Sequence, residues 1–199
     1  VSTITPKSAA AFWPTNVQPC SPAFSVTGGP PTAPPARPGR TCPMLIRIVL
    51  ADQRLTLFDD HDRPVAAYPV STAARGAGEK SGSQQTPRGR HVIRAMIGAG
   101  APIGAVFVGR RPTGEICDDV LYHAQPRRDW ILTRILWLSG CEPGRNRLGP
   151  VDTMRRYIYL HGTPDAVDMT RPGSHGCVRM RNRDIAELFD RIVPGTPVE

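Results

Sequence analysis

The sequence changes composition abruptly near residue 44, and this change limits which part of the chain can fold. Residues 1–43 contain ten of the 22 prolines and no acidic residue. Proline supplies no amide donor for a helix or a strand ladder, so we expect residues 1–43 to be a disordered tail, a flexible spacer or a misassigned upstream segment preceding the true start at Met44. From Met44 the sequence reads Met-Leu-Ile-Arg-Ile-Val-Leu, a β-branched run typical of a strand. We therefore expect one folded domain over residues 44–199.

The folded part reads as short β-strands separated by turn residues, with one helix near the C-terminus. Asn182 can cap a helix from Arg183 to Val193, in which apolar residues recur at helical spacing. These residues are Ile185, Leu188, Phe189 and Ile192. Strands are expected at 45–51, 54–58, 65–71, 90–97, 105–109, 130–138 and 156–161. This pattern predicts a mainly β fold, with sandwich or barrel-like sheets and the C-terminal helix packed on them.

Charge narrows the class of partner. Lys and Arg outnumber Asp and Glu by 25 to 17, a net charge of +8 that falls to +5 without Lys7, Arg37 and Arg40. A basic chain favours an anionic partner, but no aromatic-interleaved basic patch of the RNA-binding type is present, so we expect no nucleic-acid partner. No run of about 18 apolar residues occurs, and no basic start followed by an apolar stretch is visible. We expect no membrane span and see no export signal.

The cysteines argue against two common kinds of site. They are five in number and include no C-x-x-C pair, so a zinc ribbon or a redox dithiol is not expected. Cys117 and Cys141 could pair in an oxidising compartment, but two buried free thiols are the commoner arrangement, and this is what we expect.

Two histidines and a cysteine lie within 17 residues and suggest nucleophilic chemistry. A strand-like run ends at His161, beside a loop, where catalytic groups are commonly presented. Gly176 precedes Cys177 and lets the backbone approach a substrate, so that nearby amide N–H groups can form an oxyanion hole. A histidine can lower the pKa of a cysteine from about 8.5 and make the thiolate dominant. From the residues alone, His161 and His175 are both candidates for the base.

Two plainer interpretations compete with this one. A cysteine two positions after a histidine is most often a small core residue beside a surface imidazole. The three side chains of His161, His175 and Cys177 could also hold a metal, but no second cysteine or acidic residue lies at ligand spacing nearby. We therefore expect no metal and no cofactor. If Cys177 is a nucleophile, its thioester would be resolved by water or by an amine.

Two segments together resemble the signature of the L,D-transpeptidase catalytic domain. They are His161-Gly162-Thr163 and Ser174-His175-Gly176-Cys177-Val178-Arg179. The resemblance extends to Thr86-Pro87-Arg88-Gly89, to Trp137-Leu138-Ser139-Gly140 and to Met154-Arg155-Arg156-Tyr157-Ile158-Tyr159, and it runs from about Met44 to Glu199.

The resemblance implies the role of each motif residue. Cys177 would be the nucleophile and His161 the general base, while the Gly162 carbonyl would orient the imidazole. The amides of His175, Gly176 and Cys177 would form the oxyanion hole. Ser174 and Arg179 would hold the loop or contact the substrate.

The resemblance also implies a substrate and a place of action. The partners would be peptidoglycan stem peptides: Cys177 would attack the third residue of a tetrapeptide, release the terminal D-alanine, and pass the acyl group to a second stem as a 3→3 cross-link. A thiol hydrolase, acting as an L,D-carboxypeptidase or on protein-to-peptidoglycan links, would share the same acyl-enzyme. The site of action would be the periplasm or cell envelope, and we expect a monomer.

Overall fold

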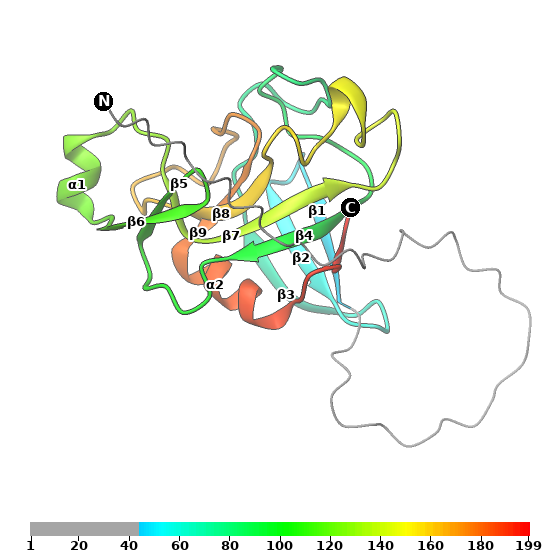
Figure 1. The fold of residues 1–199 in the computed structure, drawn as a ribbon. Coiled ribbons are helices and arrows are strands. Elements are labelled where there is room, and N and C mark those ends of the chain that lie inside the picture. The colour runs from blue at the N-terminus through cyan, green and yellow to red at the C-terminus, as the bar shows by residue number, and fades with distance from the viewer. Residues whose placement is uncertain (1–43) are drawn as a thin grey trace, which may run out of the picture. The chain divides into compact units, whose positions relative to one another are not determined.

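A computed structural model describes residues 44–199, and the predictions for residues 1–43 lie outside this range. Figure 1 shows mainly β-strands with one long helix near the C-terminus, as predicted. In chain order the elements are β1 (Leu45–Val49), β2 (Arg54–Phe58), β3 (Pro64–Pro69), β4 (His91–Ile97), β5 (Ala105–Val108), β6 (Arg111–Ile116), α1 (Asp119–Ala124), β7 (Ile131–Gly140), a 3-10 turn (Gly149–Val151), β8 (Tyr159–Thr163), β9 (Val178–Arg181), α2 (Asn182–Arg191) and β10 (Pro197–Val198).

The strands form one mixed sheet that closes on itself. Its order is β3-β2-β1-β10-β4-β7-β5-β6, and β8 and then β9 pair on the other edge of β7. The chain after β3 returns to β9, where Ser71 and Arg179 exchange two backbone hydrogen bonds of 3.0 and 2.9 Å. The predicted barrel-like arrangement is therefore built from a single sheet. Because this closure meets β9, it joins the N-terminal hairpins to the region of the sequence motifs.

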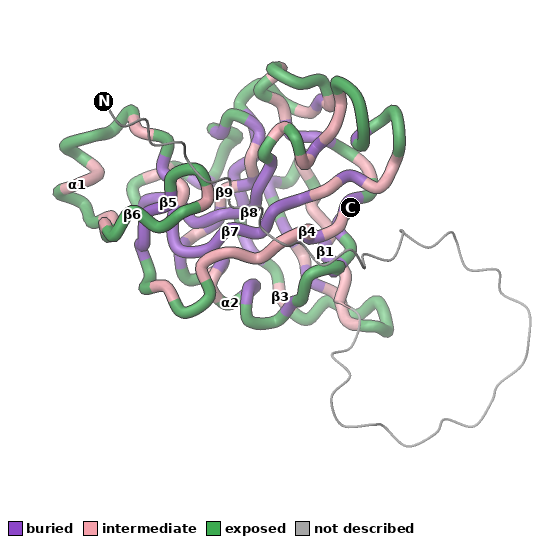
Figure 2. The backbone as a smooth tube through the Cα atoms, in the orientation of Figure 1, coloured by how far each residue is buried: buried purple, intermediate pink, exposed green. Residues whose placement is uncertain are grey.

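Strand β7 lies at the centre of the sheet and contributes side chains to the two main hydrophobic cores, one on each face. Successive side chains of a strand point to opposite faces. Leu136 and Leu138 enter a core shared with α2, β1 and β9, whereas Ile135 and Trp137 pack with Tyr159 on the other side. Figure 2 shows this strand buried along most of its length.

Helix α2 confirms the predicted apolar stripe but not the predicted cap. Ile185, Leu188, Phe189 and Ile192 are all buried in the main core. Asn182 is the first helical residue rather than the cap, because β9 runs directly into the helix and Arg181 occupies the cap position. The buried Asn182 amide instead donates to the Thr163 carbonyl at 2.9 Å and accepts from Thr133 Oγ1 at 2.6 Å. It therefore ties the helix to β8 and β7.

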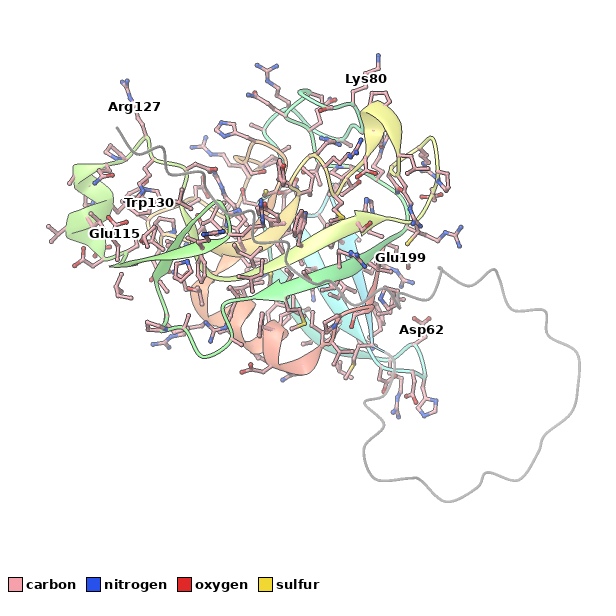
Figure 3. All side chains as sticks on the ribbon, in the orientation of Figure 1. Asp62, Lys80, Glu115, Arg127, Trp130 and Glu199 are labelled. Atoms are coloured by element: carbon pink, nitrogen blue, oxygen red, sulfur yellow. The ribbon has the colours of Figure 1, made fainter. Side chains whose placement is uncertain are left out.

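The segment between β5 and β7 contains elements that the sequence analysis did not predict. Strand β6 and helix α1 lie at one side of the fold formed by residues 44–199, and α1 buries none of its residues. Arg128 fastens this end by pairing with Glu115 at 2.6 Å and by lying 4.5 Å from the ring centroid of Trp130. Glu115 and Trp130 are labelled in Figure 3. Strand β6 is almost wholly exposed, and α1 packs only the half-buried Leu121 and Tyr122 against a small cluster, so neither element carries a clear apolar period.

The cysteine prediction is partly wrong. Cys117 is a free thiol, whereas Cys141 is disulfide-bonded, so the two do not pair with each other. Within residues 44–199 no helix is long and apolar enough to cross a membrane.

We predict that Asn182→Ala lowers the free energy of unfolding by about 1–3 kcal/mol, because the buried Thr163 carbonyl and Thr133 hydroxyl both lose a partner. Urea denaturation measures this change. Arg183→Ala, at the exposed next residue, is the matched control and should leave stability within about 0.5 kcal/mol. Equal effects of the two substitutions would contradict the role given to Asn182.

Candidate active site

The parallel pairing of β8 with β9 places His161, Cys177 and Arg179 on one face of the sheet. The register sets Leu160 opposite Val178 and His161 opposite Arg179. Leu160 and Val178 enter the core shared with α2, so His161 and Arg179 point to the opposite face. Cys177 lies directly before β9 and packs with the cluster on that opposite face. The structure therefore brings the predicted nucleophile and one predicted base to the same surface.

The Cys177 thiol contacts the backbone on both sides of Ile158. The Tyr159 N–H donates to Sγ at 3.4 Å, and the thiol donates to the Tyr157 carbonyl at 3.5 Å. The residue keeps some solvent exposure, yet the protein packed around it raises the pKa of the thiol to about 12, which the Tyr159 N–H only partly offsets. At neutral pH the resting group is therefore a thiol, not a thiolate.

His161 is buried and neutral, and its orientation is set by the next residue. Its Nδ1 lies 2.8 Å from the Gly162 carbonyl. A carbonyl can only accept, so Nδ1 carries the proton and Nε2 keeps its lone pair for use as a base. Burial lowers the pKa of His161 to about 4. The expectation that a neighbouring histidine makes the thiolate dominant is thus wrong for the resting site, because burial disfavours both charged forms.

His161, rather than His175, shares the surroundings of the thiol. Tyr159, which contacts Sγ, lies two residues before His161 in β8 and on the same face. The charges of Asp129 and Arg179 influence both Cys177 and His161. His175 is exposed on the loop before Cys177.

The loop that carries Cys177 is held by a close backbone approach at Gly176 and by hydrogen bonds to Thr86. Gly176 has φ of +134°, a conformation in which any other residue would be strained, and a Cβ there would lie 3.0 Å from Ile158 Cδ1. Thr86 Oγ1 donates to the Gly176 carbonyl at 2.9 Å and accepts from the Ala73 N–H at 3.0 Å. Thr86 is thus a positioning residue whose only sequence signal was the Thr-Pro-x-Gly resemblance.

Ser174 uses its hydroxyl inside the loop. Its Oγ donates to the Cys177 carbonyl at 2.5 Å and accepts from the Gly176 N–H at 3.2 Å. The Gly176 amide is therefore engaged in the loop, which does not fit its expected place among the oxyanion donors.

Gly162 carries the carbonyl that orients His161, and the space around it is full. A Cβ at Gly162 would lie 2.4 Å from Asn182 Oδ1 and 2.7 Å from the Leu132 carbonyl. Only glycine lets β8 approach β7 and α2 this closely.

Two arginines bring positive charge to the thiol. Arg179 donates to the Gly173 carbonyl at 2.9 Å and so holds the loop. Arg156 is half-buried, and burial lowers its pKa. Its guanidinium donates to backbone carbonyls of Gly78, Glu79 and Gln85. Both charges act to lower the pKa of Cys177, in opposition to burial.

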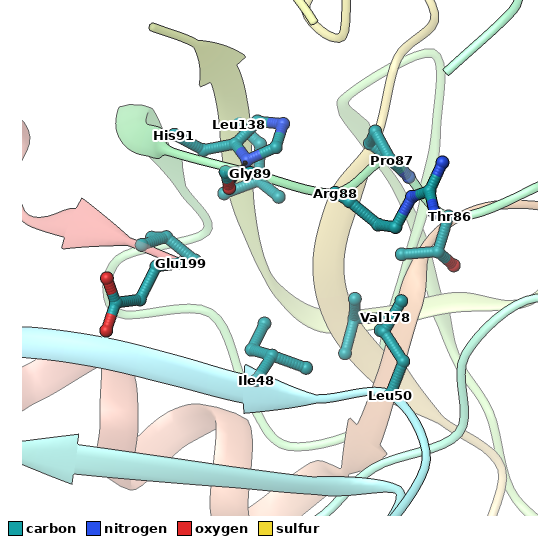
Figure 4. Close-up of a pocket in the computed structure, with 11 residues that line it drawn as sticks. Ile48, Leu50, Thr86, Pro87, Arg88, Gly89, His91, Leu138, Val178 and Glu199 are labelled. Atoms are coloured by element: carbon teal, nitrogen blue, oxygen red, sulfur yellow. Dashed lines mark hydrogen bonds between the residues drawn. The ribbon is translucent and has the colours of Figure 1, made fainter. Parts of the chain in front are cut away.

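A pocket lies on the core side of β9 and includes Thr86, His91 and Val178, but neither Cys177 nor His161 (Figure 4). Among residues 44–199 no three His, Cys, Asp or Glu side chains are gathered as a metal site.

The chain is similar to known proteins along most of its length. The family model described as the L,D-transpeptidase catalytic domain matches residues 43–199. A Bacillus licheniformis protein named YkuD, whose assignment as an L,D-transpeptidase is provisional, is 26% identical over 159 residues, covering 79% of this chain and 66% of that protein.

Two solved structures are also similar. The L,D-transpeptidase (residues 123–326) from Xylanimonas cellulosilytica is 20% identical with a TM-score of 0.45, covering 81% of this chain and 61% of that one. L,D-transpeptidase 3 from Mycobacterium tuberculosis, in complex with a faropenem-derived adduct, is 14% identical with a TM-score of 0.47, covering 79% and 59%. The chain thus spans less than two thirds of each of these relatives.

We predict that alkylation of Cys177 by iodoacetamide accelerates about tenfold per pH unit from pH 7 to pH 10 without a plateau, because the raised pKa leaves the thiolate scarce throughout this range. Peptide mass spectrometry measures the rate, and N-acetylcysteine, which levels off above about pH 9, is the reference. A plateau for Cys177 below pH 7 would contradict the neutral resting pair.

Proposed function

The chain belongs to the L,D-transpeptidase catalytic domain family, and on that premise we propose that residues 44–199 form a catalytic domain that cross-links peptidoglycan stem peptides through a thioester on Cys177. One observation carries the proposal: the His161 imidazole keeps Nε2 available on the face where the Cys177 thiol lies. The family acts on the cell wall, so we place the reaction in the cell envelope. We propose a monomer as the active form.

The first half-reaction would acylate Cys177. As Sγ attacks the donor carbonyl, His161 Nε2 takes the thiol proton, and a carbon–sulfur bond forms. The oxyanion would be received by amide N–H groups of the nucleophile loop, with those of His175 and Cys177 as candidates. The tetrahedral intermediate then loses the terminal D-alanine, whose nitrogen takes the proton from His161. Burial supports this last step, because an imidazolium with a pKa of about 4 gives up its proton readily.

The second half-reaction would transfer the acyl group. The side-chain amine of a second stem attacks the thioester, His161 accepts the amine proton, and Sγ leaves and is reprotonated. The product is a 3→3 cross-link. Water in place of the amine would yield a tripeptide by the same steps, which is the hydrolase alternative.

Charge around the site is consistent with an anionic peptide substrate. Arg156 and Arg179 place two cations close enough to influence Cys177. Neither takes part in any ion pair found within residues 44–199. Stem peptides carry several carboxylates, so attraction would favour their approach.

The proposed function is tested by incubating the protein with purified disaccharide tetrapeptide and measuring the products by mass spectrometry. We expect a cross-linked dimer and free D-alanine. Cys177→Ala should give neither, whereas Cys117→Ala, which removes the other free thiol found within residues 44–199, should behave as the parent protein. Tripeptide without dimer would replace the transferase by the hydrolase. Products from the Cys177→Ala protein would refute both.

We predict that His161→Ala slows acylation by about 10²–10⁴-fold, because the thiol loses the group that takes its proton. A carbapenem serves as the acyl donor, and intact-mass spectrometry follows the adduct. His175→Ala, a substitution of the exposed histidine, should change the rate by less than tenfold. A reversed order of the two effects would show that the base is His175.

A further inference from the structure

The turn between β5 and β6 carries an arginine in a backbone conformation that arginine rarely adopts. Val108 pairs with Arg111, so the loop consists of Gly109 and Arg110 alone. Their φ values are +54° and +68°. A two-residue turn with both φ values positive favours Gly, Asn or Asp at both positions. Arg110 therefore goes against the residue preference of its own turn, and such strain is concentrated at functional sites.

The Arg110 side chain reaches a group of three aromatic residues beside the nucleophile. Its guanidinium lies 4.7 Å from the ring centroid of Trp137 and 4.9 Å from that of Tyr157, and Nη1 donates to Tyr159 Oη at 2.9 Å. Tyr157 and Tyr159 are also the residues whose backbone groups contact the Cys177 thiol. Arg110 is thus one tyrosine side chain away from the reacting sulfur.

The Arg110 guanidinium is positioned but not neutralised. It takes part in no ion pair among the residues that the structure describes. A guanidinium carries five N–H donors in a planar fork that matches a carboxylate, and the tyrosine hydroxyl occupies one of them. The aromatic faces hold the fork rigidly without competing for its donors. What this arrangement lacks is an anion.

We propose that Arg110 binds a carboxylate of the donor peptide and thereby makes the site selective for stems in which that carboxylate is free. The inference rests on the proposed function, since it concerns the substrate of the same site. Two carboxylates could serve, the terminal one of the leaving residue and the side-chain one of the third residue. The fork would recognise either by two parallel hydrogen bonds to its two oxygens, whereas an amide offers one acceptor oxygen and an NH2 group that donates.

In an alternative role, the three aromatic residues would bind the cationic amine of the acceptor, and Arg110 would only occupy that place in its absence. The contacts favour the carboxylate role. The arginine is fixed by a hydrogen bond as well as by ring contacts, and the charges of Arg156 and Arg179 act on Cys177 with the same sign.

The test uses Arg110→Asn, which relieves the turn while it removes the guanidinium, so the variant should fold. Arg111→Asn in the adjacent exposed position is the matched control. Each is made in the Cys177→Ala protein, so that binding is measured without chemistry. Calorimetry compares three tetrapeptides: with both carboxylates free, with the terminal one amidated, and with the side-chain one amidated.

We expect the parent and the Arg111→Asn protein to bind the free acid at least tenfold more tightly than one of the two amides, which identifies the carboxylate. Arg110→Asn should abolish this preference and bind the free acid and that amide alike. The proposal is overturned if the parent shows no preference, or if the preference survives in Arg110→Asn. It is also overturned if Arg110→Asn weakens the binding of all three peptides by the same factor, or if it tightens the binding of an amine acceptor.

Failure of the proposed function would be distinguishable from failure of this inference. Carboxylate preference in the Cys177→Ala background does not depend on turnover. If the Cys177→Ala protein shows this preference while the protein that keeps Cys177 forms neither dimer nor tripeptide, only the catalytic proposal is refuted.

Discussion

The hydrogen-bonded parallel pairing of β8 and β9 is the constraint on which the site depends. It sets His161 opposite Arg179 and leaves Cys177 beside Tyr159 at the start of β9. The rest of the fold secures this pair. Closure of the sheet through Ser71 bonds the chain after β3 to β9, and Thr86 links the same segment to the loop before Cys177. The position of the thiol is thus determined from several distant parts of the chain.

Burial then decides the protonation state of the two groups. It raises the pKa of Cys177 and lowers that of His161, so both are neutral at rest. A neutral pair stores no separated charge in a low-dielectric site, and charge separation begins only when sulfur attacks a carbonyl. The same burial makes the resulting imidazolium a ready proton donor to the leaving amine. The Gly162 carbonyl, held by close packing against Asn182, selects the tautomer in which this exchange can occur.

The sequence predicted those features that depend on local pattern. Strand β7 was predictable because burial on both faces requires a mainly apolar run, and α2 because its buried residues recur at helical spacing. His161 and Cys177 were recognisable because their spacing matches a motif. The protonation state was not predictable, since it depends on how tightly other segments enclose the pair. Asn182 resembles a helix cap in sequence, but a strand that runs directly into the helix turns its side chain inward. Arg110 gave no signal, because its partners lie at least 27 positions away along the chain.

The most direct test of this account is to trap the acyl-enzyme. The protein is mixed with disaccharide tetrapeptide, quenched in acid within the first turnover, digested and mapped by mass spectrometry. The account predicts a tripeptide acyl group as a thioester on the peptide that contains Cys177, with one D-alanine released per acyl group formed. An acyl group on Cys117 or on any hydroxyl, or product formation with no acylated peptide, would contradict it.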